Sequence, residues 1–164
     1  MQNPTKFIMD MLRQKILTAA NALQQDGELP EGALVDFEVE IPKDVANGDF
    51  STNFAMKNAR VFRLAPRAIG EKVAAAMGEV PYVKEIAVAG AGFINFIMDQ
   101  SYFAMILESV AEMGQDYGRS NHFDGERVMV EFVSANPTGP MHMGNARGGA
   151  LGDCMAAVLD AAGF

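Results

Sequence analysis

The feature that most constrains this chain is the loop Ser134-Ala-Asn-Pro-Thr-Gly-Pro-Met-His-Met-Gly-Asn145. An apolar run at 128–133 precedes the loop, and a run rich in alanine, glycine and leucine at 146–162 follows it. This order predicts a strand, a loop and a helix. Each proline of the loop fixes its own φ angle and restricts the residue before it, so we expect a stiff connection.

The residues at the expected helix start favour contact with phosphate. A helix start with bare backbone N–H groups carries about half a positive charge and suits an anion. The pattern is neither a Gly-x-x-x-x-Gly-Lys-Ser/Thr loop, because no lysine follows the glycines, nor a Gly-x-Gly-x-x-Gly fingerprint. We therefore expect half of a nucleotide-binding βα unit. In it, His142 and Asn145 donate hydrogen bonds to the phosphates of ATP, and Gly144 lets the adenine approach the backbone.

Composition limits the remaining possibilities. A chain of 164 residues can form one core, or one domain and part of another. The net charge of −8 argues against a protein that grips nucleic acid with its whole surface, but it allows a local basic patch. The single cysteine, Cys154, excludes an intrachain disulfide and a zinc cluster, so we expect a cytoplasmic protein without a metal site. No apolar run approaches the ~20 residues of a membrane span, so we expect no membrane partner.

The first hundred residues alternate between helix and strand patterns. Apolar residues at helical spacing predict a helix over 4–25, and strict alternation predicts a half-buried strand over 35–41. A loop over 42–50 follows, and Ser51 or Thr52 is expected to cap the next helix. Pro66 is expected to begin another helix, which ends near Met77.

Three cations recur at spacing three in the first of these two helices. Lys57, Arg60 and Arg63 therefore lie along one side of it. They either face a phosphate backbone or form an ordinary solvated helix face. They are the notable cluster of positive charge in an acidic chain, which adds weight to the first interpretation without displacing the second.

Two apolar runs, 82–88 and 93–98, surround Ala89-Gly-Ala-Gly92 and predict a hairpin. In the second run Phe93 and Asn95 share one face. An aromatic ring beside an amide can stack on a nucleic-acid base and hydrogen-bond to it. The alternative is that Phe93 belongs to the core and Asn95 is an edge residue. A helix from 99 to about 116 follows the hairpin, and a polar stretch at 119–126 marks the expected domain boundary.

At this point the residues resemble a known family. The run Val130-Glu-Phe-Val-Ser-Ala-Asn-Pro-Thr-Gly-Pro-Met-His-Met-Gly-Asn-Ala-Arg-Gly-Gly-Ala-Leu-Gly-Asp153 resembles the signature of bacterial arginyl-tRNA synthetases. Within it, His142-Met-Gly-Asn145 is similar to the His-Ile-Gly-His motif of class I synthetases. The runs Gly48-Asp-Phe-Ser-Thr-Asn-Phe-Ala55 and Gly90-Ala-Gly-Phe-Ile-Asn-Phe96 resemble the N-terminal additional domain of the same family.

The resemblance implies an α/β fold in two parts. Residues 1–118 would form an α+β additional domain of about three strands and four helices, which binds the D-loop of tRNA. Residues 119–126 would be a linker. Residues 127–164 would be the first strand and helix of a Rossmann-like class I catalytic domain, truncated.

The resemblance also implies an activity, arginine–tRNA ligation. Such an enzyme activates arginine with ATP, accompanied by Mg²⁺, to arginyl-adenylate, and transfers the arginine to tRNA(Arg). The matching positions are Glu131, Ser134 and Asn136 for arginine; His142, Gly144 and Asn145 for ATP, with His142 and Asn145 catalytic; and Phe93 and Asn95 for tRNA. One position departs from the family: Asn145 stands where its motif usually has a second histidine, and an amide can donate a hydrogen bond but cannot carry charge.

The family's second catalytic motif, of the Lys-Met-Ser-Lys-Ser type, does not occur in these 164 residues. We therefore expect a fragment that is inactive alone, from a protein that is a monomer at full length. A strand at 128–133 without parallel partners should be disordered, lie at an edge, or pair with another chain. Two alternatives remain: a stand-alone RNA-binding module over 1–118, and a small nucleotidyltransferase, although such enzymes carry the histidine motif near the N-terminus.

Overall fold

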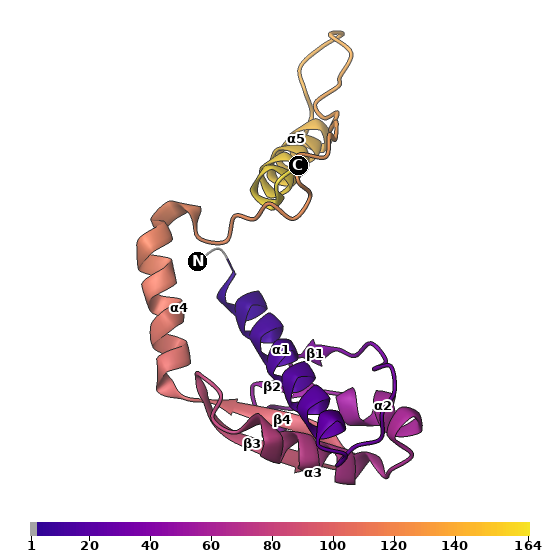
Figure 1. The fold of residues 1–164 in the computed structure, drawn as a ribbon. Coiled ribbons are helices and arrows are strands. Elements are labelled where there is room, and N and C mark those ends of the chain that lie inside the picture. Colours follow the sequence, from indigo (N-terminus) through magenta and orange to yellow (C-terminus); the bar gives the residue numbers. More distant parts are fainter. Residues whose placement is uncertain (1–2) are drawn as a thin grey trace. The chain divides into compact units, whose positions relative to one another are not determined.

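The structure, a computed structural model, describes residues 3–164 and divides into two compact units. The first unit is Pro4–Glu108 and the second contains Ser109–Phe164. Figure 1 labels their helices and strands. The linker expected at 119–126 stays a prediction, because these units describe compactness and not evolutionary domains.

The first unit contains a four-stranded antiparallel sheet. Its strands are β1 (Val39–Glu40), β2 (Phe50–Thr52), β3 (Val83–Ala89) and β4 (Phe93–Met98), in the order β1-β2-β4-β3. The predicted hairpin is confirmed as β3 and β4. The sequence suggested about three strands, because β2 lies where we expected the end of a loop and a helix cap. Three residues carry too little periodicity to reveal a strand, and β2 exists because β1 and β4 pair with its two sides.

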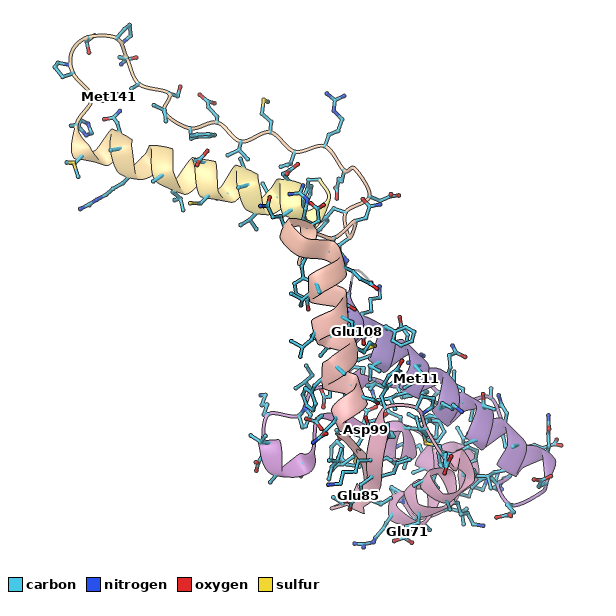
Figure 2. The ribbon with its side chains drawn as sticks, turned by 90° about the vertical axis from the view of Figure 1, so that its left-hand side faces the viewer. Met11, Glu71, Glu85, Asp99, Glu108 and Met141 are labelled. Carbon is cyan, nitrogen blue, oxygen red and sulfur yellow. The ribbon has the colours of Figure 1, made fainter. Side chains whose placement is uncertain are left out.

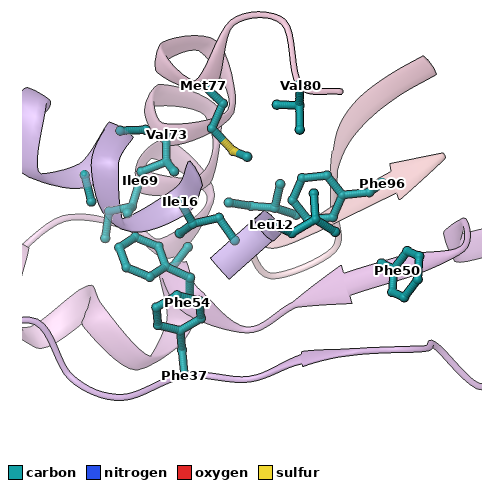
Figure 3. Close-up of a cluster of buried hydrophobic side chains, with 14 of the residues drawn as sticks. Leu12, Ile16, Phe37, Phe50, Phe54, Ile69, Val73, Met77, Val80 and Phe96 are labelled. Carbon is teal, nitrogen blue, oxygen red and sulfur yellow. The ribbon is translucent and has the colours of Figure 1, made fainter. Parts of the chain in front are cut away.

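Three helices pack against one face of this sheet. They are α1 (Pro4–Gln25), α2 (Phe54–Phe62) and α3 (Pro66–Met77), as the sequence predicted. Figure 3 shows how Leu12 and Ile16 of α1 meet Phe96 of β4 and the apolar side of α3. The large side chains at the centre are fully buried, including Phe50, Phe54, Phe62, Phe96, Ile69 and Ile94.

The strand predicted over 35–41 is wrong in extent, because only Val39–Glu40 pairs with a neighbour. Of the expected apolar face, Phe37 is buried, whereas Val35 and Ile41 are exposed. The ring of Phe37 packs edge-on against Phe54, with ring centres 4.9 Å apart. One anchoring aromatic residue thus replaces the continuous apolar face that strict alternation suggested.

Side chains from the helices explain why residues 35–38 do not pair with a neighbouring strand. The amide of Asn58 on α2 accepts a hydrogen bond from the Val35 N–H at 2.8 Å and donates one to the Val35 carbonyl at 3.2 Å. Asn53 accepts from the Glu38 N–H at 3.1 Å, and Arg13 donates to the carbonyl of Phe37. Because side chains satisfy these backbone groups, the segment needs no neighbouring strand.

The next helix, α4 (Gln100–Met113), begins after Asp99 as predicted, and a 3₁₀ turn (Gly114–Asp116) follows it. Helical spacing of the apolar residues predicts a covered face of Phe103, Ile106, Leu107, Val110 and Met113, and the structure buries a different side. The buried residues are Tyr102, Met105 and Ser109, whereas Phe103 and Leu107 are 51% and 69% exposed. The Tyr102 ring meets Phe50 edge-on with ring centres 5.9 Å apart, so the core selects which side of the helix is covered.

The second unit is built on α5 (Met143–Ala162), which starts three residues before the predicted run 146–162. The strand predicted at 128–133 is wrong, because these residues have no strand structure here. Instead, Phe132 lies so close over Gly152 that a Cβ atom there would overlap its ring, and a Cβ on Gly149 would lie 3.1 Å from Val133. Glycines on α5 thus make room for the segment.

The stretch 119–125 is held at the end of α5. The N–H groups of Ser120 and Gly125 donate to the carbonyls of Ala161 at 2.8 Å and Gly163 at 2.7 Å. The Phe123 and Phe164 rings stack with centres 3.9 Å apart. Residues of the expected linker therefore donate hydrogen bonds to carbonyl groups that the end of the helix leaves without intrahelical partners. Among the described helices, none combines the length and the apolar composition that crossing a membrane requires.

Candidate functional site

The sheet of the first unit carries a polar row on the face away from the core. Strand register places Ser51 of β2 opposite Asn95 of β4, with Glu40 and Ala87 continuing the row on either side. The Ser51 hydroxyl donates to Oδ1 of Asn95 at 2.7 Å, and both side chains are buried. This bond holds the Asn95 side chain in place, and with its oxygen accepting from Ser51 its nitrogen is left to donate to a ligand.

A pocket of about 300 Å³ opens above this row. Phe93, 37% exposed, stands at its edge, and strand pairing puts Ala89 beside it. Small neighbours leave the Phe93 ring accessible. The pocket is lined by Glu40, Pro42, Lys43, Asp44, Asn47, Ser51, Ala89, Gly90, Phe93 and Asn95.

The loop between β1 and β2 forms one wall of the pocket and is clamped to β4. The Asp49 N–H donates to the Phe96 carbonyl at 2.9 Å, and the Asp49 carboxylate accepts from the Met98 N–H at 2.7 Å. Gly48 has a φ of 86°, and a Cβ there would lie 2.8 Å from the Phe96 oxygen, so only glycine fits. The wall is therefore positioned by the strand that carries Phe93 and Asn95.

The structure thus brings Phe93 and Asn95 into one pocket. An accessible ring beside an oriented amide donor is the arrangement that holds an unstacked base. The sequence reasoning did not find Ser51 as the partner of Asn95, nor the 42–47 wall. The turn signal Asn47-Gly48-Asp49 was the available sign that the chain reverses there.

At the second predicted site, His142 is the residue that begins α5. Its Nδ1 accepts a hydrogen bond from the Gly144 N–H at 3.0 Å, and its carbonyl accepts from the Asn145 N–H at 2.9 Å. A Cβ on Gly144 would lie 2.8 Å from Cε1 of His142, so the glycine makes room for the imidazole. With Nδ1 accepting, the neutral ring carries its proton on Nε2, where it can donate to an external oxygen.

The residues expected on the arginine side are not assembled around His142. Glu131, Ser134 and Asn136 are exposed, and among the described residues no hydrogen bond or ion pair joins their side chains to His142 or Asn145. The intervening loop makes tight local turns, with Thr138 N–H donating to the Asn136 carbonyl at 2.8 Å. Figure 2 shows Met141 where this loop meets the start of α5.

Lys57, Arg60 and Arg63 of the predicted basic stripe are exposed on α2. The two cations of α3 are paired instead. Arg67 bonds Glu71 at 3.0 Å, and Lys72 bonds Glu28 of another segment at 2.9 Å. Glu71 is labelled in Figure 2. Within residues 3–164, no group of three or more His, Cys, Asp or Glu side chains is arranged to hold a metal ion.

The chain is similar to known proteins. The family described as arginyl tRNA synthetase N terminal domain matches residues 10–98. The arginine–tRNA ligases of Ruminiclostridium cellulolyticum and Caldanaerobacter subterraneus subsp. tengcongensis are 45% and 46% identical to this chain over its whole length. The chain covers 29% of each of these relatives.

The fold is also found in a solved structure of another protein. The arginyl-tRNA synthetase of Plasmodium falciparum superposes on 93% of this chain and 29% of its own, with a TM-score of 0.56 and 20% identity. That identity supports a common fold and no finer likeness. The family match over 10–98 spans more than half of the chain and includes α2, α3, the hairpin and the Phe93–Asn95 pocket. The chain therefore belongs to the arginyl-tRNA synthetase N-terminal domain family.

Proposed function

We propose that this chain is the tRNA-facing part of an arginine–tRNA ligase, and that the Phe93–Asn95 pocket receives a base from the D-loop of tRNA(Arg). The observation that carries the proposal is the Ser51–Asn95 hydrogen bond, which holds an amide beside an accessible aromatic ring. Relatives that match the whole chain are named arginine–tRNA ligase, and they are longer than this chain. We assign the complete reaction to a protein of their length, acting in the cytoplasm.

The pocket suits one base because each recognition element is already in place. Phe93 supplies a face for stacking, which is tolerant of base identity, and Asn95 supplies a directional donor, which is not. The hydrogen bond from the buried Ser51 hydroxyl restricts where the Asn95 side chain lies. Little side-chain freedom is lost on binding, so affinity is not spent on ordering the site.

Binding of a tRNA(Arg) transcript to the chain tests this proposal. Removing the Phe93 ring or the Asn95 amide by alanine substitution should weaken binding by about 1–3 kcal/mol, or roughly 5- to 150-fold in Kd. Deleting the D-loop nucleotides should weaken binding of the transcript by the parent protein. The same deletion should weaken binding by the Phe93→Ala variant only slightly further. The measurement is fluorescence anisotropy at fixed salt.

Two substitutions serve as matched controls. Phe103→Ala removes another exposed ring, and Asn21→Ala removes an exposed amide on α1. Both should leave Kd unchanged. Equal losses for Phe93→Ala and Phe103→Ala, or full binding by Asn95→Ala, would contradict a specific base pocket.

For the second unit we propose that His142 and Asn145 bind the phosphates of ATP, with Gly144 beside them, and that Glu131, Ser134 and Asn136 bind arginine. The support is chemical. Nε2 of His142 can donate to a phosphate oxygen at a helix start, and the Glu131 carboxylate is accessible to a guanidinium or ammonium group. Mg²⁺ would arrive with ATP and lower the negative charge of its phosphates.

The chain alone should therefore not form arginyl-tRNA, because the arginine-side residues are not gathered around His142. In a protein as long as the relatives, His142→Ala should reduce arginine-dependent pyrophosphate exchange by about 10²–10³-fold, the range for one lost transition-state donor. With tRNA(Arg) at a saturating concentration, Phe93→Ala should leave the exchange rate near that of the parent, because this substitution removes no proposed contact to arginine or ATP. Exchange at the parent rate in His142→Ala would remove the assigned role.

A further inference from the structure

One helix of the first unit carries unbalanced positive charge. Helix α2 contains no Asp or Glu, and Lys57, Arg60 and Arg63, here named the α2 row, are exposed along it and at its end. Among the described residues the α2 row forms no ion pair, whereas Arg67 and Lys72 of α3 are each paired with a carboxylate. In a chain of net charge −8, Arg60 and Arg63 are thus available to an external anion, and Lys57 is exposed beside them although its charge also acts on the Asp36 carboxylate.

Arg63 holds a conformation that disfavours its own side chain. It caps the C-terminus of α2 with a φ of 53° and a ψ of 34°, in the left-handed region. Helices commonly end on such a residue, but that residue is usually glycine, because a Cβ atom is strained there. A guanidinium group is therefore present where the fold alone would favour glycine. Such strain accumulates at functional positions.

The α2 row ends close to the base pocket. Arg63 lies three residues before Pro66, and a Cβ on Gly92 would lie 2.7 Å from the Pro66 carbonyl carbon. Gly92 directly precedes Phe93, so the start of α3 packs on the turn that leads to the stacking ring. Three residues reach at most about 11 Å, which limits how far Arg63 can lie from Pro66 and this turn.

We propose that the α2 row binds the phosphate backbone of the same RNA strand whose base enters the Phe93–Asn95 pocket. This inference rests on the proposed function of the pocket. Recognition of single-stranded RNA combines a positive track for the backbone with an aromatic ring for the base. Here the strand would pass around the Gly90–Gly92 turn, from the pocket to the end of α2. Arg63, nearest Pro66, would contact a phosphate next to the flipped base.

The experiment measures Kd of the full chain for a tRNA(Arg) transcript between 50 and 200 mM salt. Each of Lys57→Gln, Arg60→Gln and Arg63→Gln should weaken binding and reduce the slope of log K against log salt by about 0.7, the value for one single-strand phosphate contact. Arg63→Lys should keep the slope. Lys72→Gln, which changes the net charge equally at a cation already paired with Glu28, should keep both slope and affinity.

Arg63→Gly separates binding from folding. Glycine relieves the left-handed strain, so this variant should melt at a higher temperature than the parent while losing the same part of the salt slope as Arg63→Gln. A variant that is more stable and binds RNA more weakly cannot owe its defect to misfolding. A lower melting temperature together with an unchanged slope would overturn the assignment of Arg63.

The outcomes also distinguish the α2 row from the pocket. Phe93→Ala should lower affinity without changing the slope, because stacking releases no counterions. Unchanged slopes in all three glutamine variants overturn the α2 row even if Phe93→Ala weakens binding. If the glutamine variants reduce the slope while Phe93→Ala binds as tightly as the parent, the α2 row is supported as a phosphate site and the pocket is overturned. Equal affinity for polyglutamate of matched charge would overturn RNA as the partner.

Discussion

At the scale of single residues, Arg13 shows how one side chain can anchor an irregular segment. Its guanidinium group lies 4.5 Å from the centre of the Phe37 ring, donates to the Phe37 carbonyl, and pairs with Asp36. The hydrogen bond from Arg13 and its charge lower the pKa of Asp36 below the ordinary 3.8. Three contacts from α1 thus replace the strand pairing that residues 35–38 lack.

The lowered pKa of Asp36 predicts a pH-dependent contribution to stability. A carboxyl whose pKa is lower in the folded state stabilises it above the unfolded pKa, and this contribution disappears as the pH falls through the folded value. The urea midpoint of Asp36→Asn should therefore lie slightly below that of the parent at pH 7, and the difference should shrink as the pH falls below the ordinary pKa of 3.8. The effect is small because Asp36 is exposed.

The same substitution in a variant that lacks Arg13 tests whether Arg13 is the partner of Asp36. In Arg13→Met, which keeps much of the aliphatic stem, the pH dependence of the Asp36→Asn effect should be smaller than in the parent, because the largest causes of the lowered pKa are removed. A difference between parent and Asp36→Asn that grows in acid would show that Arg13 does not stabilise the ionised carboxylate.

At the scale of elements, some helices and strands follow from local sequence pattern, whereas others depend on tertiary contacts. Helix α1 and the β3–β4 hairpin follow from residues close together in sequence, through helical spacing and a glycine-rich turn. Strand β2 and the buried side of α4 depend on distant residues. Tyr102 is covered and Phe103 is not because Phe50 lies against Tyr102, and no periodicity within α4 contains that information.

The turn of the hairpin offers a matched pair of glycines. Both Gly90 and Gly92 have positive φ, but a Cβ on Gly90 meets nothing within 4 Å, whereas one on Gly92 meets the backbone of Pro66. Gly90→Ala should cost about 1–2 kcal/mol of unfolding free energy from left-handed strain alone. Gly92→Ala should cost about 1–3 kcal/mol more, because the overlap forces the backbone apart.

Chemical denaturation of the two variants measures the difference. Gly92→Ala should also weaken tRNA binding, since its turn carries Phe93, whereas Gly90→Ala should have a smaller effect on binding. Equal destabilisation by the two substitutions would show that the contact between the turn and Pro66 is loose.

At the scale of the whole molecule, the two units differ in what is buried. The first unit contains the core of α1, α2, α3 and the sheet. Of residues 109–164, Ser109 and Gly152 are the buried ones, and Leu151 and Val158 of α5 are 66% and 67% exposed. Since helices derive most of their stability from a packed apolar face, α5 is held mainly by the contacts of 119–133.

Hydrogen exchange should reveal this difference. Amides in the middle of α1 should be protected up to the global unfolding free energy, whereas amides of α5 should exchange through local opening at a much lower free energy. Mass spectrometry of peptides from the two helices at pH 7 makes the comparison. Equal protection of α1 and α5 would show that α5 is stabilised by contacts beyond those of its own unit.

The sequence by itself determined the regular helices, the hairpin, the shared face of Phe93 and Asn95, and the family, because these depend on local periodicity, turn chemistry and motif spacing. It could not show that Ser51 would orient Asn95, that residues 42–47 would wall the pocket, or that Asn58 and Arg13 would end a strand. Each of those contacts joins residues more than twenty positions apart, or depends on such a contact. Only tertiary structure decides them, because buried polar groups accept whichever partner the fold brings within hydrogen-bonding distance.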